Sequence, residues 1–223
     1  MSAPNTDREV YLDNSATTRV CRAAADKVYA VMTENYGNPS SLHTRGFMAE
    51  QELADARASV AQLIGARPED VIFTSGGTEA NNLAVLGSVA AHARDGRHIV
   101  TTAVEHSSIA ACCDRLEKQG YEVTRLQPDE DGGITAASIA AACRADTVLV
   151  AVMMVNNETG ARFRLEDAVA AIRSRAPHVH IHADAVQAAG KLPLKAERWG
   201  FDSLSLSAHK IHGPKGSGAL YLR

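Results

Sequence analysis

The sequence predicts an α/β fold with one seven-stranded, mostly parallel sheet and helices on both of its faces. Short runs rich in Val and Ile recur roughly every 20 to 30 residues, and the segments between them carry helical periodicity. Apolar residues make up 45% of the chain and charged residues 22%, which is typical of a globular protein with a buried core. A length of 223 residues fits one main domain of this class.

Seven segments predict the strands in chain order. They are VIFTS (71–75), HIVTTAVE (98–105), EVTRLQ (122–127), TVLVAVMMV (147–155), HVHIHAD (178–184), DSLSLS (202–207) and GALYLR (218–223). The last two are too close for a helical crossover, so GALYLR is expected to run antiparallel to its predecessor. The alternation in DSLSLS predicts a half-exposed strand with Ser203, Ser205 and Ser207 on one face.

Two segments near the N-terminus predict amphipathic helices. The first, within residues 20–37, has one apolar face made of Val20, Ala24, Val28 and Val31. The second, within residues 49–66, is expected to lie on the surface and to end at Gly65 in the left-handed conformation. Its apolar face consists of Leu53, Ala56, Val60, Leu63 and Ile64.

The cysteines are Cys21, Cys112, Cys113 and Cys143. Their spacing contains no CxxC pair, so neither a metal site nor a disulfide framework is expected in a chain without a secretory signal. Helical spacing places Cys113 on one face with Ile109 and Leu116, and Cys143 on one face with Ile139. Each of the four is therefore expected to pack in the core.

Charge and hydropathy argue against two classes of partner. The net charge is −3 and Lys and Arg form no cluster, so direct binding of nucleic acid is not expected. The longest apolar run, TVLVAVMMV, is much shorter than the roughly 20 residues that span a bilayer. The opening residues, MSAPNTDREV, lack the apolar core of a signal peptide. We expect a cytoplasmic enzyme without membrane contact.

Unusual polar residues follow several predicted strands, at the sheet edge where parallel α/β folds bind ligands. After VIFTS come two glycines that let a ligand approach, and Thr78 opens a helix whose free N–H groups attract an anion; helix capping by Ser75 or Thr78 is the alternative. His106 follows HIVTTAVE at a helix start, where a purely structural histidine is the alternative. Asn157, within NNETG, also fits a polar turn.

The predicted strands HVHIHAD and DSLSLS deliver a carboxylate and an amine to the same edge. Asp184 ends HVHIHAD, and Gln187 follows three residues later on the same side of a predicted helical segment; a helix N-cap is the alternative role for Asp184. Lys210 follows DSLSLS beside His209. Partial desolvation and nearby cations would lower the pKa of Lys210 and make it a nucleophile toward a carbonyl, whereas Lys191, Lys195 and Lys215 better fit surface lysines.

Together these side chains describe one ligand, pyridoxal 5′-phosphate. Lys210 is expected to react with its carbonyl and Asp184 to keep its ring nitrogen protonated, so that the ring can accept electrons from a breaking bond. Gln187 is expected to donate to its ring hydroxyl. The expected phosphate cradle consists of Thr78, Ser207 and His209.

Seven motifs, in order, carry a resemblance to a known family. They are YLDNSATT, GNPSSLH, FTSGGTEANN, EHSSI, VNNETG, HADAVQAAGK and SAHKIHGPKGSGALY. With these motifs the chain resembles the cysteine desulfurases of the NifS/IscS type nearly from end to end. The resemblance implies a type I pyridoxal-phosphate transferase fold in a homodimer, with residues 1–15 joining a small domain and residues 16–223 forming the large, cofactor-binding domain.

The resemblance also implies roles for individual residues. Lys210 would form the Schiff base, and His106 would stack on the cofactor ring and carry protons. Asp184 would pair with the pyridinium, and Gln187 and Asn157 would face the ring hydroxyl and the substrate. The phosphate would be bound by Gly77, Thr78, Ser207 and His209.

The implied reaction converts L-cysteine into L-alanine and an enzyme-bound persulfide, supplying sulfur for iron–sulfur clusters, thio-cofactors or tRNA. The implied sulfur acceptor is a scaffold protein or a sulfurtransferase. Family members continue into a small C-terminal domain with a substrate-binding arginine and a mobile loop bearing the catalytic cysteine, and neither lies within these residues. A non-catalytic cofactor-binding module or half of a split enzyme is therefore an alternative. An aminotransferase or a kynureninase-like lyase is a third, which VNNE and HGPKG argue against.

Overall fold

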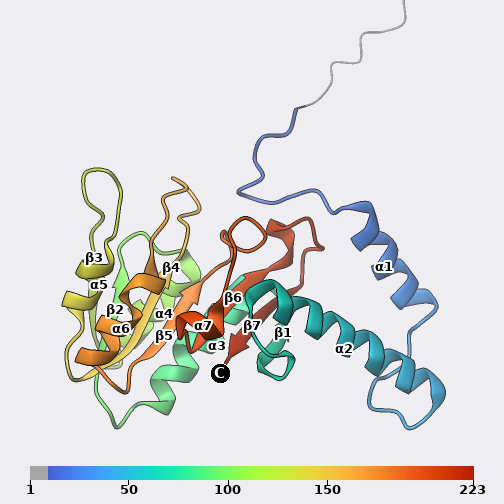
Figure 1. The fold of residues 1–223 in the computed structure, drawn as a ribbon, viewed down its shortest axis with the longest axis horizontal. Coiled ribbons are helices and arrows are strands. Elements are labelled where there is room, and N and C mark those ends of the chain that lie inside the picture. The colour runs from blue at the N-terminus through green and yellow to red at the C-terminus, as the bar shows by residue number, and fades with distance from the viewer. Residues whose placement is uncertain (1–9) are drawn as a thin grey trace, which may run out of the picture.

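The computed structural model describes residues 10–223, which fold around one seven-stranded sheet (Figure 1). All seven predicted strands are present. They are β1 (Val71–Thr74), β2 (His98–Thr102), β3 (Glu122–Leu126), β4 (Thr147–Met153), β5 (His180–Asp184), β6 (Ser203–Ser207) and β7 (Gly218–Leu222).

The strands lie in the order β1-β7-β6-β5-β4-β2-β3, and the sheet is mixed. The pairs from β6 through β5, β4 and β2 to β3 are parallel. Strand β7 runs antiparallel to both of its neighbours, β6 and β1, as the short connection from β6 predicts. The carboxyl ends of β1, β2, β4, β5 and β6 therefore meet at one edge of the sheet.

Helices cover both faces of the sheet, as predicted. The helices are α1 (Arg22–Thr33), α2 (Thr44–Ile64), α3 (Gly77–Ala91), α4 (Ser107–Glu117), α5 (Ala136–Ala142), α6 (Leu165–Arg175) and α7 (Ala196–Trp199), with short 3-10 turns η1 (Pro68–Asp70) and η2 (Ala208–Lys210). On one face α3 and α4 pack against Ile99 and Leu149. On the other face α5 and α6 pack against Val150 and Val152. Alternate residues of β4 thus enter two separate cores.

Both N-terminal helices are present and α2 lies at the surface, as predicted, but their apolar faces differ from the prediction. The helices extend to one side of the sheet (Figure 1), and no residue of α1 is buried. In α2 the buried residues are Gly46 near its start and Ala61 and Ile64 at its end, while Leu53 and Leu63 are exposed. The predicted apolar faces are therefore mostly uncovered here. The predicted stop at Gly65 is confirmed, because this residue has φ +64°.

Strand β6 was expected to be half exposed, and this prediction is wrong. All five of its residues are buried, because β6 lies between β5 and β7 and has cores on both faces. The buried hydroxyl of Ser203 is satisfied by two histidines of β5, since it lies 2.8 Å from both His180 Nε2 and His182 Nδ1. Ser203 thus belongs to a polar network inside the protein and is not exposed to solvent.

Three of the four cysteines are buried in the core, as predicted. Burial raises the pKa of Cys113 to about 12 and that of Cys143 to about 11, so both thiols remain protonated and unreactive. The prediction is wrong for Cys21, which is exposed at the start of α1. Within residues 10–223, no helix has the combination of length and apolar character that crossing a membrane requires.

Candidate active site

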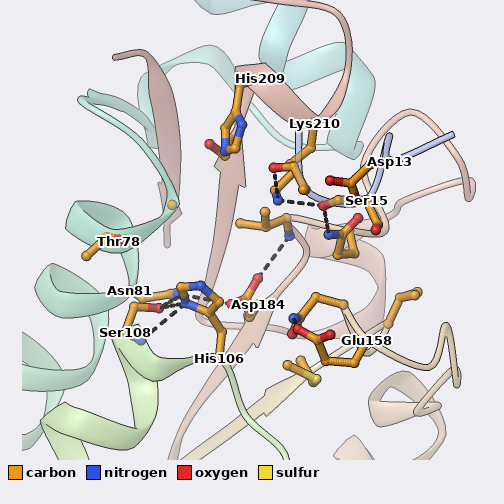
Figure 2. A pocket seen from close by; sticks show the side chains of 18 residues that line it. Asp13, Ser15, Thr78, Asn81, His106, Ser108, Glu158, Asp184, His209 and Lys210 are labelled. Atoms are coloured by element: carbon orange, nitrogen blue, oxygen red, sulfur yellow. Dashed lines mark hydrogen bonds between the residues drawn. The ribbon is translucent and has the colours of Figure 1, made fainter. Parts of the chain in front are cut away.

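The loops at the carboxyl edge of the sheet enclose a cavity of about 410 Å³ (Figure 2). All the residues predicted from the sequence as site residues line this cavity. They are Gly77, Thr78, His106, Asn157, Asp184, Gln187, Ser207, His209 and Lys210. Five separate loops bring them together, because the parallel strands that precede these loops end at the same edge.

Lys210 reaches the cavity from η2, directly after β6. Its Nζ donates hydrogen bonds to the carbonyl oxygens of Ser15 (2.6 Å) and Ala16 (2.8 Å) in the N-terminal segment. Desolvation lowers the pKa of Lys210, while the carboxylates of Asp13, Asp184 and Glu158 oppose that shift. A lowered pKa increases the neutral fraction of the amine, which is the form that attacks a carbonyl.

Asp184 ends β5 and is buried at the floor of the cavity. Its Oδ1 accepts a hydrogen bond from the Val186 N–H (2.9 Å), and its Oδ2 accepts one from Asn81 Nδ2 (2.7 Å). The segment that follows consists of turns, so the predicted helix is absent and Asp184 is not a helix cap. Burial raises the pKa of Asp184, opposed by these two donors and by His106. A buried carboxyl in this state is stabilised as the anion by a cationic partner.

His106 has the structural role that the sequence left open, and it also lines the cavity. It is the N-cap of α4, and its Nδ1 accepts a hydrogen bond from the Ser108 N–H at 3.2 Å. The hydroxyl of Ser108 lies 2.8 Å from the same nitrogen. Because Nδ1 is held as an acceptor, Nε2 is the ring nitrogen at which His106 can exchange a proton with a ligand.

The N-terminus of α3 forms a wall of the cavity that is suited to bind an anion. The N-cap is Gly76, which has no side chain, so neither Ser75 nor Thr78 caps the helix with its hydroxyl. The helix begins one residue before the predicted Thr78. N–H groups of its first turn have no partner within the helix and attract negative charge. Ser207, which is buried, and His209 complete the wall.

We predict that Gly77→Ala weakens binding of the phosphate group. A Cβ at this position would lie 2.7 Å from Val186 Cγ2 and 3.6 Å from Ser207 Cβ, so Val186 would have to shift into the cavity that it lines. The expected result is about a 10-fold higher dissociation constant for pyridoxal 5′-phosphate, measured by absorbance titration. Gly87→Ala is the control, since a Cβ there meets nothing within 4 Å. If Gly77→Ala and the wild-type chain bound the cofactor with equal affinity, the phosphate would not be held at this position.

Two predicted amides lie at the cavity wall with their polar atoms engaged elsewhere. Gln187 Nε2 donates to the Ser15 carbonyl at 2.8 Å, and its Oε1 accepts from Lys191 Nζ at 3.1 Å. Asn157 Nδ2 donates to Glu158 Oε1 at 2.5 Å. Their role toward the ring hydroxyl therefore stays a prediction.

Sequence reasoning missed several residues that line the cavity. Asn81 lies one helical turn after Gly77, so helix periodicity could have placed it on the same face. Asp13 and Ser15 come from a segment almost two hundred residues before Lys210, and no local pattern marks their approach. The missed lining residues are Asp13, Ser15, Ala16, Asn81, Ser108, Met153, Val155, Glu158 and Val186.

Glu105, beside His106, is a further missed residue. Its carboxyl accepts hydrogen bonds from the Met153 N–H (3.0 Å) and the Thr102 hydroxyl (2.8 Å), and it joins the ends of β2 and β4. Desolvation raises the pKa of Glu105 to about 8. The unfolded chain loses this proton above about pH 4.5, whereas the folded chain retains it to about pH 8. Glu105 therefore makes folding less favourable as pH rises through that window.

We predict that Glu105→Gln flattens this pH dependence of stability. Urea unfolding at about pH 5 and about pH 8 should show a smaller loss of unfolding free energy in the variant than in the wild-type chain. Glu117→Gln is the control, because Arg125 lowers the pKa of this surface carboxyl and it titrates below the window. An unchanged slope in Glu105→Gln would show that the carboxyl is ionised in the folded chain.

The cavity fits pyridoxal 5′-phosphate by three observations on its own atoms. The first turn of α3, with a glycine where a Cβ would close the wall, can hold a phosphate. The buried Asp184 carboxyl can pair with a protonated ring nitrogen. Lys210 supplies a primary amine of lowered pKa in the same cavity. Figure 2 shows Thr78, Asp184 and Lys210 arranged around the same space.

The chain is similar to several known proteins over nearly its whole length. Cysteine desulfurase IscS of Tolumonas auensis is 47% identical over 219 residues, which cover 96% of this chain and 53% of the relative. A solved NifS-like protein superposes with a TM-score of 0.91 at 35% identity, over 97% of this chain and 59% of that one. A structure described as SspA in complex with cysteine gives a TM-score of 0.90 at 34% identity, over 96% and 61%.

The chain spans about half the length of the curated relatives it matches. A family model described as aminotransferase class-V matches residues 10–223. This match includes each loop that lines the cavity and each predicted site residue. The chain belongs to the class-V aminotransferase family.

Proposed function

We propose that this chain is the cofactor-binding part of a cysteine desulfurase, which converts L-cysteine into L-alanine and transfers the sulfur as a persulfide. Pyridoxal 5′-phosphate is the cofactor of the family. The observation that carries the proposal is the single cavity that joins Lys210, Asp184, His106 and the N-terminus of α3. Relatives named cysteine desulfurases, and a structural neighbour described in complex with cysteine, support the choice of substrate.

Each wall of the cavity has a defined task in this reaction. Bound pyridoxal 5′-phosphate supplies a carbonyl for the substrate amine and a ring that accepts electrons. The first turn of α3 would bind the phosphate, and Asp184 would hold a proton on the ring nitrogen. Lys210 would hold the carbonyl end of the cofactor, and its neutral Nζ could take a proton from the substrate carbon. His106 carries its hydrogen on Nε2, so this nitrogen could donate a proton and then receive one back.

Sulfur transfer requires a thiolate, and no cysteine within residues 10–223 lines the cavity. Cys112, Cys113 and Cys143 are buried in the core, and Cys21 is exposed at the start of α1. This observation favours a second candidate, in which the described residues act as a cofactor-binding module and a thiol from elsewhere accepts the sulfur. The two candidates differ in whether the chain turns over alone.

Further parts of the proposal concern assembly and location. Exposed apolar side chains on α1 and α2, among them Tyr29, Met32 and Phe47, support a homodimer. We place the sulfur acceptor, a scaffold protein or a sulfurtransferase, in iron–sulfur cluster or thio-cofactor synthesis in the cytoplasm. Residues 1–15 belong in this proposal to a small domain and residues 16–223 to the large one; residues 1–9 lie outside the described part.

Turnover of L-cysteine in the presence of excess dithiothreitol tests the proposal. The sulfur atom leaves L-cysteine, which becomes L-alanine; two thiols are oxidised to a disulfide, and the sulfur is released as sulfide. Alanine and sulfide in equal amounts are expected from a desulfurase. A cofactor-loaded chain that produces neither would support the module, and a chain that takes up no cofactor would contradict both candidates.

A further inference from the structure

A buried hydrogen-bond chain begins at the cavity wall, and Asn81 is its centre. Asn81 Nδ2 donates to Asp184 Oδ2 (2.7 Å) and to Ser108 Oγ (2.8 Å), and Ser108 Oγ lies 2.8 Å from His106 Nδ1 (Figure 2). On its other side, Asn81 Oδ1 lies 2.9 Å from His182 Nε2. Asn81 thus contacts Asp184 directly and His106 through the Ser108 hydroxyl.

Beyond Asn81 the chain continues into the sheet, and its donors and acceptors can be assigned. Burial lowers the pKa of His182 to about 3 and that of His180 to about 4, so both rings are neutral. The Asn81 oxygen only accepts, so His182 carries its hydrogen on Nε2 and its Nδ1 accepts from the Ser203 hydroxyl at 2.8 Å. That hydroxyl in turn accepts from His180 Nε2–H at 2.8 Å.

The Asp184 carboxylate fixes the orientation of the Asn81 amide, and the His182 tautomer follows from it. If the amide were reversed, its oxygen would face the Asp184 carboxylate, and these two buried acceptors would repel each other, so the reversal is disfavoured. An amide does not readily pass on a proton, so the chain orients its ends and does not conduct protons between them.

We propose that Asn81, whose amide is oriented by Asp184 and is hydrogen-bonded on its other side to His182 and through it to Ser203, is a positioning residue that fixes the Asp184 carboxylate and the His106 ring relative to each other for the cofactor. The inference rests on the proposed function and extends it to β5 and β6, because neither His182 nor Ser203 lines the cavity. The charged or titratable groups that also face Asp184 are Lys210 from η2 and Glu105 and His106 from the loop before α4.

Two substitutions of Asn81 test its contact with Asp184. Asn81→Ala removes one donor from Asp184 and should raise the cofactor dissociation constant about 10- to 100-fold, the range for one hydrogen bond to a charged group. Asn81→Asp keeps the shape but places a second carboxyl beside Asp184. The introduced group can donate only when protonated, so cofactor affinity in this variant should rise more steeply as pH falls than in the wild-type chain. A merely structural role would not add this pH dependence.

Ser203→Ala tests the remote part of the chain. It leaves every cavity-lining residue in place but removes the donor that holds the His182 tautomer, and it should weaken cofactor binding about 2- to 10-fold. Ser88→Ala is the matched control, because this buried hydroxyl of α3 bonds only to the Val85 carbonyl of its own helix (3.2 Å). An effect of Ser88→Ala equal to that of Ser203→Ala would overturn the inference.

Histidine nitrogen shifts in the chain without cofactor give an independent readout. In wild-type chain labelled with ¹⁵N-histidine, His182 should be neutral with its hydrogen on Nε2 near pH 7, and Asn81→Ala should give a mixture of tautomers. If wild-type chain binds no cofactor, the proposed function fails together with the inference. If it binds cofactor but the Asn81 variants bind it equally well and show the wild-type pH dependence, only the inference fails.

Discussion

Lys210→Ala is expected to abolish covalent attachment of the cofactor and the visible absorbance band that accompanies it. Lys210 is the amine that the cavity offers to a carbonyl, and desolvation lowers its pKa. Turnover of L-cysteine should fall by at least about 10²-fold, because both the anchoring amine and a proton-transfer group are lost. The measurement combines absorbance spectra of cofactor-loaded protein with alanine release.

Two controls separate this chemistry from loss of structure. Lys215→Ala, in the exposed turn that follows, should keep the band and the rate. In Lys210→Ala, added methylamine should restore part of the rate by supplying the missing amine. A variant that retains the band would show that another lysine carries the cofactor.

Asp184→Asn is expected to weaken cofactor binding and to increase the free energy of unfolding of the chain without cofactor. The neutral amide cannot stabilise a protonated ring nitrogen, so the dissociation constant should rise about 10- to 100-fold and the rate should fall with it. Burial raises the pKa of Asp184, so its ionisation opposes folding increasingly above about pH 3.8. The stability of the variant relative to wild type should therefore grow as pH rises through the folded pKa of Asp184.

A substitution that weakens cofactor binding but stabilises the cofactor-free chain distinguishes a functional carboxyl from a structural one. Urea unfolding without cofactor at several pH values gives the stability, and absorbance titration gives the affinity. Asp114→Asn, at an exposed carboxylate paired with Arg125, should change neither quantity appreciably. If Asp184→Asn lowered the free energy of unfolding by the same amount at every pH, the carboxylate would be needed for folding.

The sheet and the position of the site could be predicted from the sequence because both depend on burial patterns. TVLVAVMMV is a continuous apolar run because β4 is covered on both faces. All seven segments predicted as strands form strands in the structure. Once the strands are parallel, the residues that follow them must meet at one edge. That is why Thr78, His106, Asp184 and Lys210 line one cavity.

The features that sequence could not predict depend on distant partners. Alternating Ser and Leu in β6 has the pattern of a half-exposed strand, but His180 and His182 satisfy Ser203 inside the sheet. Ser15 contacts Lys210 across 195 residues of chain. The apolar stripes of α1 and α2 predicted burial, whereas the described residues leave them mostly exposed. An apolar stripe along a helix shows that this face can be covered, but it does not show what covers it.

The most direct test is to reduce the cofactor-loaded wild-type chain with sodium borohydride and map the labelled peptide by mass spectrometry. One pyridoxyl-phosphate group is expected on the Lys210 side chain, and none on Lys191, Lys195 or Lys215. Label on any of these three lysines, or no label after reduction, would contradict the assignment of this cavity as the cofactor site.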